Sequence, residues 1–282
     1  MSAELPWRGP GEGRPDLPLP PDRMPRRRGG RSLKRWLYVG VFAEEFLLCA
    51  ARVQVGPLGQ TFWVIHDRDA GEMHEHTRIR PPGARGEVWT EDDLVHVMAG
   101  KDVRAKLRPG AGPAVETVCP TEEGKYTWTR KAADLPFECD VRVNGKRWKL
   151  EARGVRDESA GYHPRHTVWS WSAGVGRASD GRSVGWNLVS GINDPPRDSE
   201  RSIWVDGEPF EPGPVEFEDL DGIEFEGGER LRFEPECERS RKQNLVLVRY
   251  TYTQPFGRFS GSLPGLELER GLGVMEHHDA VW

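Results

Sequence analysis

The segment from His163 to Ser190, HPRHTVWSWSAGVGRASDGRSVGWNLVS, is the most informative stretch of the chain. It predicts two antiparallel strands joined at Asp180-Gly181, because this dipeptide tolerates the positive φ angles of a tight hairpin turn. Side chains alternate between the faces of a strand, so Trp169 and Trp171 are expected on one face of the first strand. Such an indole-lined wall suits a binding site, and it also suits a core strand that is entered through a polar loop.

The same turn signal recurs on both sides of this segment. Asn144-Gly145, Asp206-Gly207 and Asp221-Gly222 each separate runs in which apolar and polar residues alternate, and another hairpin is expected at Glu44-Glu45. No stretch keeps the 3.6-residue period of a helix. The residues after Thr90 are compatible with a helix start or with a strand. The pattern predicts an all-β, antiparallel fold of two barrel-like or sandwich-like halves with little helix.

Three parts are expected along the chain. Residues 1–32 are rich in Pro, Gly and Arg and lack a hydrophobic period, which predicts an irregular arm that packs on the body through Trp7 or Leu17. Residues 33–155 form the predicted N-terminal β half, and residues 156–282 form the C-terminal one.

Composition places the chain among globular proteins of modest core size. Its 282 residues are 36% hydrophobic and 30% charged, and eleven of them are Trp. The mean hydropathy is −0.67, and no apolar run approaches the roughly 20 residues that a membrane span needs. The cysteines lack a Cys-x-x-Cys pair and are expected to be reduced. With no signal-peptide pattern at the N-terminus, these features predict a cytoplasmic protein without a transmembrane segment.

The charge distribution bears on the choice of partner. Seven basic residues and no acid lie between Arg23 and Arg35, although the whole chain carries a net charge of −5. A basic block can bind nucleic acid. The remaining body is acidic and would repel phosphate backbones, so we predict a solvated arm and no nucleic-acid partner. The sequence leaves the oligomeric state open.

Two histidines close together in the sequence are candidate metal ligands. His74-Glu75-His76 would put two imidazoles on one face of a strand, which is a spacing that metal sites use. The surrounding residues are typical of a solvated turn, and no acid follows at the expected distance. We therefore predict no metal site. Since no phosphate loop or nucleophile motif is present either, we predict no cofactor.

The run from Asp157 to His166 is the candidate catalytic segment. A carboxyl group beside an apolar wall has a raised pKa and can donate a proton, and Asp157 is the preferred donor. Tyr162 and His166 would relay the proton or orient the acid, and Arg165 would anchor a polar end of the substrate. The alternative is structural, with an Asp157–arginine pair that fixes the loop.

The tryptophans are the candidate ligand-binding residues. Trp169, Trp171 and Trp186 are expected to line a cavity for a small apolar molecule, although large buried indoles also serve as core. The chain ends on Trp282, which suggests that the tail is held against the body. Glu276, together with His277 or His278, would then reach the same pocket or pair with an arginine.

Ordered motifs resemble a known family. WSWSAGVG, DGRSVGWNLVSGIND, ERSIWVDGE, PFGRFSGSL and GLGVMEHHDAVW, together with the earlier GGRSLKRWLYVGVF, resemble the bacterial family called domain of unknown function 2804 over residues 30 to 282. The resemblance implies a double lipocalin-like or calycin-like architecture. It also implies a distant similarity to carotenoid hydratase and AttH-like proteins, whose relatives include cyclases.

The sequence is compatible with two classes of function. One is an enzyme, a hydratase or cyclase that uses acid–base chemistry on an isoprenoid, lipid or polyketide-like molecule. The other is a non-catalytic ligand carrier or interaction module with a Trp-rich core.

Overall fold

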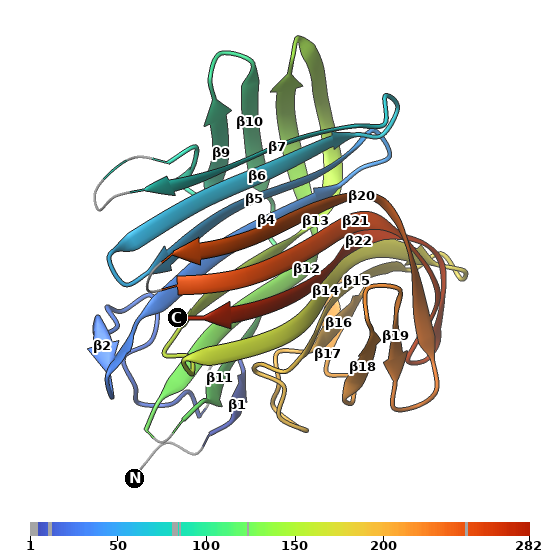
Figure 1. Ribbon diagram of the computed structural model, residues 1–282. Helices are drawn as coiled ribbons and strands as arrows, with labels where there is room; N and C mark the ends of the chain where they lie inside the picture. Colours follow the sequence, from blue (N-terminus) through green and yellow to red (C-terminus); the bar gives the residue numbers. More distant parts are fainter. Residues whose placement is uncertain (1–4, 11–12, 81–83, 85, 123, 246–247) are drawn as a thin grey trace.

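Long hairpins organise the molecule (Figure 1). In the computed structural model, which describes residues 5–10, 13–80, 84, 86–122, 124–245 and 248–282, every regular element is a β-strand. The longest hairpin joins β12 (Tyr126–Val143) to β13 (Lys146–Gly161) at Asn144-Gly145, whose φ angles are 46° and 90°. The opening segment of the sequence forms β14 (His166–Ala178) and β15 (Ser183–Ser190). The predicted all-β, antiparallel fold is confirmed.

The first sheet holds eleven strands within the described residues. Its main path runs β7–β6–β5–β4–β13–β12–β10–β9–β8, and β11 pairs with both β12 and β1. The sheet curls, because β8 at one edge contacts β5 and β6 near the other. The remaining bounds are β1 (Trp7–Gly9), β4 (Lys34–Phe42), β5 (Phe46–Val55), β6 (Leu58–Asp67), β7 (Glu72–Arg80), β8 (Val88–Glu91), β9 (Leu94–Ala99), β10 (Val103–Pro109) and β11 (Val115–Pro120). The short strands β2 (Arg27–Arg28) and β3 (Arg31–Ser32) pair separately.

The second sheet holds nine strands within the same described residues, in the order β17–β16–β15–β14–β22–β21–β20–β19–β18. The strands not yet given are β16 (Ser202–Val205), β17 (Glu208–Phe210), β18 (Val215–Glu218), β19 (Gly222–Phe225), β20 (Arg230–Leu245), β21 (Val248–Leu263) and β22 (Leu266–Val281). Figure 1 shows its longest strands lying beside those of the first sheet.

Three apolar cores follow from the alternation of side chains along the strands. On β5, Leu48 and Ala50 face a core inside the first sheet, whereas Leu47 and Cys49 face outward. Those outward side chains meet Trp171 and its neighbours from the second sheet and form a core between the two sheets. A third core lies inside the second sheet. β5 is therefore apolar on both faces over residues 46–51, as a strand covered on two sides must be.

The turns largely follow the sequence signals. Asp206-Gly207 adopts φ angles of 50° and 86°, as a tight hairpin turn requires. The ambiguous segment after Thr90 is a hairpin whose turn residues Asp92 and Asp93 have φ angles of 45° and 64°. The turn expected at Asp221-Gly222 is displaced, because Gly222 already belongs to β19 and Asp219 takes the positive φ of 49°.

The N-terminal arm packs on the first sheet. Trp7, Leu19 and Met24 are buried against Tyr126 and Tyr162, and β1 adds a short strand beside β11. The chain leaves the first sheet after Gly161, so the expected division at residue 155 falls inside β13. The division into two halves as separate domains stays a prediction.

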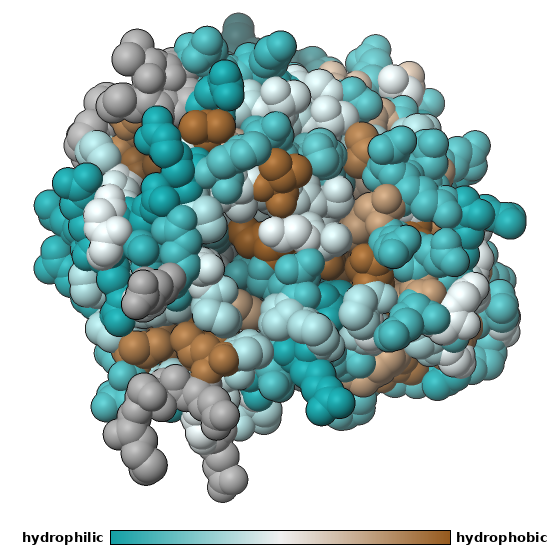
Figure 2. Space-filling model, turned by 60° about the horizontal axis from the view of Figure 1, so that its bottom comes forward, coloured by the Kyte–Doolittle hydropathy of each residue, from teal (hydrophilic) through white to brown (hydrophobic). Residues whose placement is uncertain are grey.

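The surface is mostly polar where it can be seen. On the face drawn in Figure 2, hydrophobic residues form separate patches surrounded by hydrophilic ones. Within the part of the chain that the structure describes, no helix is long and apolar enough to cross a membrane.

Candidate functional site

A cavity of about 100 Å³ lies between the two sheets, next to the core that joins them. β4, β5 and β6 form one wall, and β14, β21 and β22 form the other. A second cavity of about 90 Å³ adjoins it and shares Val53, Phe62, Tyr252, His278 and Trp282. The first cavity is lined by Trp36, Leu37, Tyr38, Ala51, Val53, Phe62, Lys131, Asp157, Trp169, Trp171, Val189, Ile192, Asn193, Glu200, Tyr252, Glu276, His278 and Trp282. Its walls are thus aromatic and aliphatic, with a few polar groups at defined places, as ligand sites generally are.

Glu276 on β22 supplies the first polar group. Its Oε1 accepts a hydrogen bond of 2.9 Å from Nε1 of Trp169, and its Oε2 accepts one of 2.8 Å from Nε2 of Gln254. Glu276 as a whole residue is 8% exposed. Burial raises its pKa to about 7, although the bond from Trp169 opposes the rise. A carboxyl group with this pKa holds a proton for a large part of the time near neutral pH.

An ionic cluster of Lys131, Asp157 and Glu200 supplies the second polar region. Nζ of Lys131 lies 2.6 Å from Oδ2 of Asp157 and 3.3 Å from Oε1 of Glu200. Burial lowers the pKa of Lys131, but the two carboxylates outweigh this and raise it overall. Burial raises the pKa of Glu200 to about 7, while Lys131 acts in the opposite direction. One buried lysine therefore offsets the charge of two buried acids only in part, and the Glu200 carboxyl holds a proton more readily than an ordinary one.

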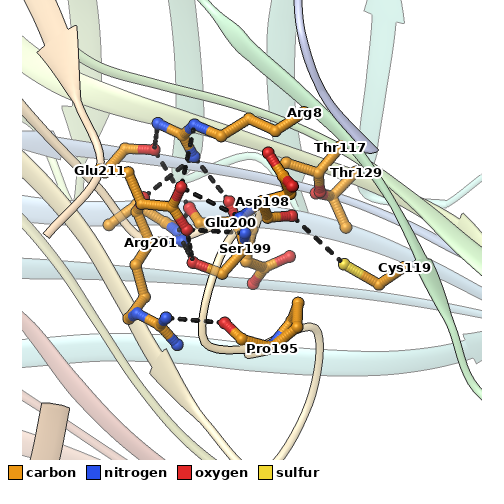
Figure 3. A network of polar contacts seen from close by, with 12 residues as sticks. Arg8, Thr117, Cys119, Thr129, Pro195, Asp198, Ser199, Glu200, Arg201 and Glu211 are labelled. Atoms are coloured by element: carbon orange, nitrogen blue, oxygen red, sulfur yellow. Dashed lines mark hydrogen bonds and ion pairs between the residues drawn. The ribbon is translucent and has the colours of Figure 1, made fainter. Parts of the chain in front are cut away.

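Glu200 is held by a tightly bonded loop, residues 191–201, between β15 and β16 (Figure 3). Nη1 of Arg8 on β1 donates to the backbone oxygens of Ser199, at 2.6 Å, and Arg201, at 3.0 Å. Glu211 accepts from the backbone nitrogen of Ser199 at 2.7 Å and also from its hydroxyl at 2.6 Å. The guanidinium of Arg201 caps the backbone oxygens of residues 194 and 195. These bonds fix the loop that brings Ile192, Asn193 and Glu200 to the cavity.

Several buried polar atoms of the lining have no hydrogen-bond partner among the described residues. They are the hydroxyls of Tyr38 and Tyr252, Oδ1 of Asp157, Oδ1 of Asn193 and Nε2 of His278. A buried polar atom without a partner costs about 1–3 kcal/mol. Unpartnered donors and acceptors around one apolar cavity indicate a place where a ligand or water supplies the missing bonds.

His278 is a neutral aromatic part of the wall. Its ring centroid lies 4.1 Å from that of Trp169 and 5.2 Å from that of Tyr252. Burial lowers its pKa to about 3, so the imidazole is uncharged at neutral pH. Burial also raises the pKa of Tyr38 and Tyr252 above the ordinary value, which keeps both hydroxyls protonated.

Comparison with known proteins places the chain in a family. The family model described as domain of unknown function (DUF2804) matches residues 94–282, which is more than half of the chain. The chain belongs to this family. The relationship expected from the ordered motifs is thereby confirmed. No curated protein matches the sequence.

Among solved structures, the DUF2804 chain is similar to kievitone hydratase from Nectria haematococca, with a TM-score of 0.56 and 14% identity over 86% of this chain and 88% of that one. It is also similar to CghA with Sch210972 (TM-score 0.48, 9% identity, 94% and 95% covered) and to a putative AttH from Nitrosomonas europaea (TM-score 0.43, 11% identity, 93% and 98% covered). The similarity to kievitone hydratase shows the double lipocalin-like fold, and at this identity it shows the fold alone.

Five of the residues expected from sequence line the cavity of this DUF2804 protein, namely Asp157, Trp169, Trp171, Glu276 and His278. Asp157 pairs with Lys131 rather than with an arginine. Trp171 donates from Nε1 to Oδ1 of Asn187 at 2.8 Å.

The other expected residues lie elsewhere. Tyr162 is buried under the arm and donates from its hydroxyl to the backbone oxygen of Pro25 at 2.7 Å. Trp186 packs in the core inside the second sheet and bonds Ser172. His166 pairs with Asp279 at the surface, His277 contacts Ser170, and Arg165 donates to the backbone oxygen of Trp282. These five residues do not line the cavity.

Sequence reasoning missed Lys131, Glu200 and Tyr252. Lys131 alternates in phase with the buried Thr127 and Thr129, and this phase was the available signal for a buried lysine. Glu200 lies in a loop, where no period applies, and nothing in the sequence pointed to it. On β21, Tyr252 and Gln254 are buried and Thr251 is exposed, so the alternation of this strand was the available signal for Tyr252.

The histidines considered as metal ligands lie apart from the cavity on β7. His76 is 2.8 Å from Glu87 through Nδ1, and His74 lies 3.8 Å from Glu72. Among the described residues of this family member, no group of three or more His, Cys, Asp or Glu side chains is arranged to hold a metal ion. The four cysteines are free thiols.

Proposed function

We propose that this DUF2804 protein binds a small, mainly apolar molecule between its two sheets and catalyses acid–base chemistry on it, as a hydratase or cyclase. The observation that carries the proposal is Glu276, a buried carboxyl group whose pKa of about 7 combines with an aromatic wall. A general acid works best when its pKa lies near the working pH.

The ligand class follows from the unpartnered atoms. Asp157 and Asn193 offer acceptors, so the ligand is expected to carry a hydroxyl or phenol that donates to them. The Tyr38 and Tyr252 hydroxyls can donate to an oxygen of the same ligand. The rest of the molecule is apolar, because the remaining wall offers indole, phenyl and aliphatic surface. Isoprenoid, phenolic and polyketide-like compounds fit this description.

In the proposed hydration, Glu276 transfers its proton to one carbon of a double bond, and a C–H bond forms as the π bond breaks. The indole faces of Trp169 and Trp171 stabilise the developing cation by roughly 0.5–2 kcal/mol per contact. Water then forms the C–O bond, and the Asp157–Lys131–Glu200 cluster accepts its proton. In a cyclisation, a second double bond replaces water as the nucleophile. A C–C bond forms as its π bond breaks, and the resulting cation loses a C–H proton to the same cluster to give a new double bond. Before the next turnover, Glu276 takes up a proton from solvent and the cluster releases one to solvent.

The proposal is tested by identifying the ligand and following its turnover. Native mass spectrometry of the protein purified from its own host identifies the bound molecule, and incubation in H₂¹⁸O then reports hydration as a mass increase. Glu276→Gln and Asp157→Asn are each expected to reduce turnover by at least ~10²-fold with the fold intact. Glu267→Gln, an exposed acid on the same strand, is the control and should keep full activity.

The indoles give a matched pair for binding. Trp169→Phe should weaken ligand-induced fluorescence quenching, whereas Trp186→Phe should leave it unchanged, because Trp186 faces a different core. Binding without detectable turnover in the parent protein would make it a carrier instead, and unchanged turnover in Glu276→Gln would contradict the role of Glu276 as the acid. A purified protein that neither carries a ligand nor responds to apolar hydroxylated compounds would contradict the whole proposal.

A further inference from the structure

A separate hollow of about 380 Å³ opens on the inner face of the first sheet, across β4 and β5 from the cavity described above. Arg35 and Arg52 alternate in phase with Leu37 and Ala50, whose side chains face the core inside that sheet. The arm forms part of the rim through residues 20–22. The hollow is therefore the mouth of the N-terminal half rather than a branch of the inter-sheet cavity.

Three arginines line this mouth, namely Arg35 on β4, Arg52 on β5 and Arg80 on β7. Within the described part of the chain, no carboxylate lies within 4.0 Å of any of them, whereas Glu158 in the same wall is already paired with Arg130, at 3.5 Å, and Arg156, at 2.9 Å. Asp22 on the rim is exposed. The mouth thus carries an excess of positive charge in a protein whose net charge is negative.

The guanidinium groups are not simply free in solvent. Arg52 is half-buried, and burial together with the nearby Arg80 lowers its pKa. Nη1 of Arg80 donates to the backbone oxygen of Ala84 at 2.6 Å, and its Nε is buried without a partner among the described residues. Two like charges that are partly desolvated and lack a counterion destabilise the fold unless an anion lies between them.

Gly59 makes room for this arrangement. It lies opposite Arg80 on β7 and opposite Gln54 on β5. A Cβ atom at residue 59 would come within 2.7 Å of Nη2 of Arg80, so the guanidinium occupies the space that a side chain would fill. The bare backbone at this position holds Arg80 close to the sheet beside Arg52.

We propose that this arginine hollow, formed by Arg35, Arg52 and Arg80, binds an oxyanion, namely a carboxylate or phosphate group. The planar fork of a guanidinium matches the two oxygens of such a group, and charge-assisted bonds of this kind are the strong ones. The site is independent of the function proposed for the inter-sheet cavity.

Thermal unfolding with inorganic phosphate tests the proposal directly. Phosphate at an ionic strength matched with chloride is expected to raise the melting temperature of the parent protein in a saturable way. Arg52→Gln and Arg80→Gln should lose this shift. Arg104→Gln should keep it, because the exposed Arg104 lies on β10 outside the hollow and its guanidinium bonds to the backbone oxygens of Gly100 and Val103. In chloride alone, Arg52→Gln should melt at or above the parent temperature, because repulsion with Arg80 is relieved.

Gly59→Ala gives a second test that keeps every charge. It displaces the Arg80 guanidinium and should weaken phosphate binding roughly tenfold, as expected for the loss of one charge-assisted contact. Absence of a phosphate shift in the parent protein, or a shift in Arg52→Gln and Arg80→Gln as large as that of the parent, would overturn the proposal. Competition of acetate and of octanoate with phosphate then distinguishes the two possible sources of the anion. Tighter competition by octanoate assigns the site to an amphipathic acid, and equal competition assigns it to a free oxyanion.

Discussion

The indole of Trp169 donates a 2.9 Å hydrogen bond to Glu276 from the neighbouring strand, and the same carboxyl group accepts a second bond from Gln254. Both donors favour the ionised carboxylate. The effect of burial is larger, however, and raises the pKa of Glu276 to about 7. The carboxyl group is therefore oriented by two donors while it still holds its proton near neutral pH.

The first prediction concerns the stability of Glu276→Gln. The folded protein binds a proton at Glu276 up to about pH 7, whereas the unfolded chain releases it near pH 4.5. The contribution of Glu276 to the free energy of unfolding is therefore fully present below pH 4.5. It falls by roughly 2–3 kcal/mol as the pH rises to about 7. Urea unfolding between pH 4.5 and 8 should show a flatter profile for Glu276→Gln. Parallel profiles would contradict the raised pKa.

The second prediction concerns His163, which stacks on Trp36 with ring centroids 4.9 Å apart. Burial, reinforced by Lys34, lowers its pKa to about 3. The unfolded chain then binds more protons than the folded one between about pH 6.5 and 3, so stability falls as pH falls through this range. His163→Phe should therefore lose less stability than the parent between pH 7 and 4.5, as measured by chemical denaturation. Equal losses would show that His163 is charged in the fold.

The third prediction concerns the lysine between two acids. Lys131→Met leaves Asp157 and Glu200 buried without a counterion and should cost about 3–5 kcal/mol of unfolding free energy. Asp157→Asn leaves the Lys131–Glu200 pair and should cost less, about 1–3 kcal/mol. Urea titrations at pH 8 measure both, since Glu200 is then ionised. A smaller loss for Lys131→Met than for Asp157→Asn would contradict the shared pairing.

The fourth prediction concerns Arg8, which ties the arm to the loop of residues 191–201. Arg8→Gln should destabilise the protein by about 1–3 kcal/mol and raise hydrogen exchange within that loop. Arg14→Gln is the matched control, because Arg14 is also on the arm but bonds Glu116 and Pro20 instead. Faster exchange in both variants would mean that the whole arm, rather than Arg8, holds the loop.

The sequence predicted the hairpins better than the faces that they present. A two-residue turn at Asp180-Gly181 would pair Val175 with Trp186. The observed loop has three residues, with the backbone nitrogen of Ala178 donating to the oxygen of Arg182, so Gly174 pairs with Trp186 instead. A shift of one residue moves a side chain to the opposite face. Trp186 accordingly lies over Gly174 in the inner core, away from Trp169 and Trp171.

The polar part of the site was predictable only where it lies near its neighbours in sequence. Asp157 and Trp169 were expected together because they flank one short connection. Glu200 meets Lys131 across 69 positions of sequence, through a loop whose path depends on Arg8 and Glu211. Such long-range contacts depend on how the two sheets stack, and the alternation of residues along a single strand does not predict this.

The shared lysine makes the two halves of the molecule non-interchangeable. Lys131 and Asp157 come from the first sheet, and Glu200 comes from the loop before β16 in the second. A C-terminal half transplanted from another lipocalin-like protein would remove one carboxylate from this cluster, and a transplanted N-terminal half would leave Glu200 with no cation. Any recombination or directed evolution that shuffles halves must therefore move residues 131, 157 and 200 as one unit.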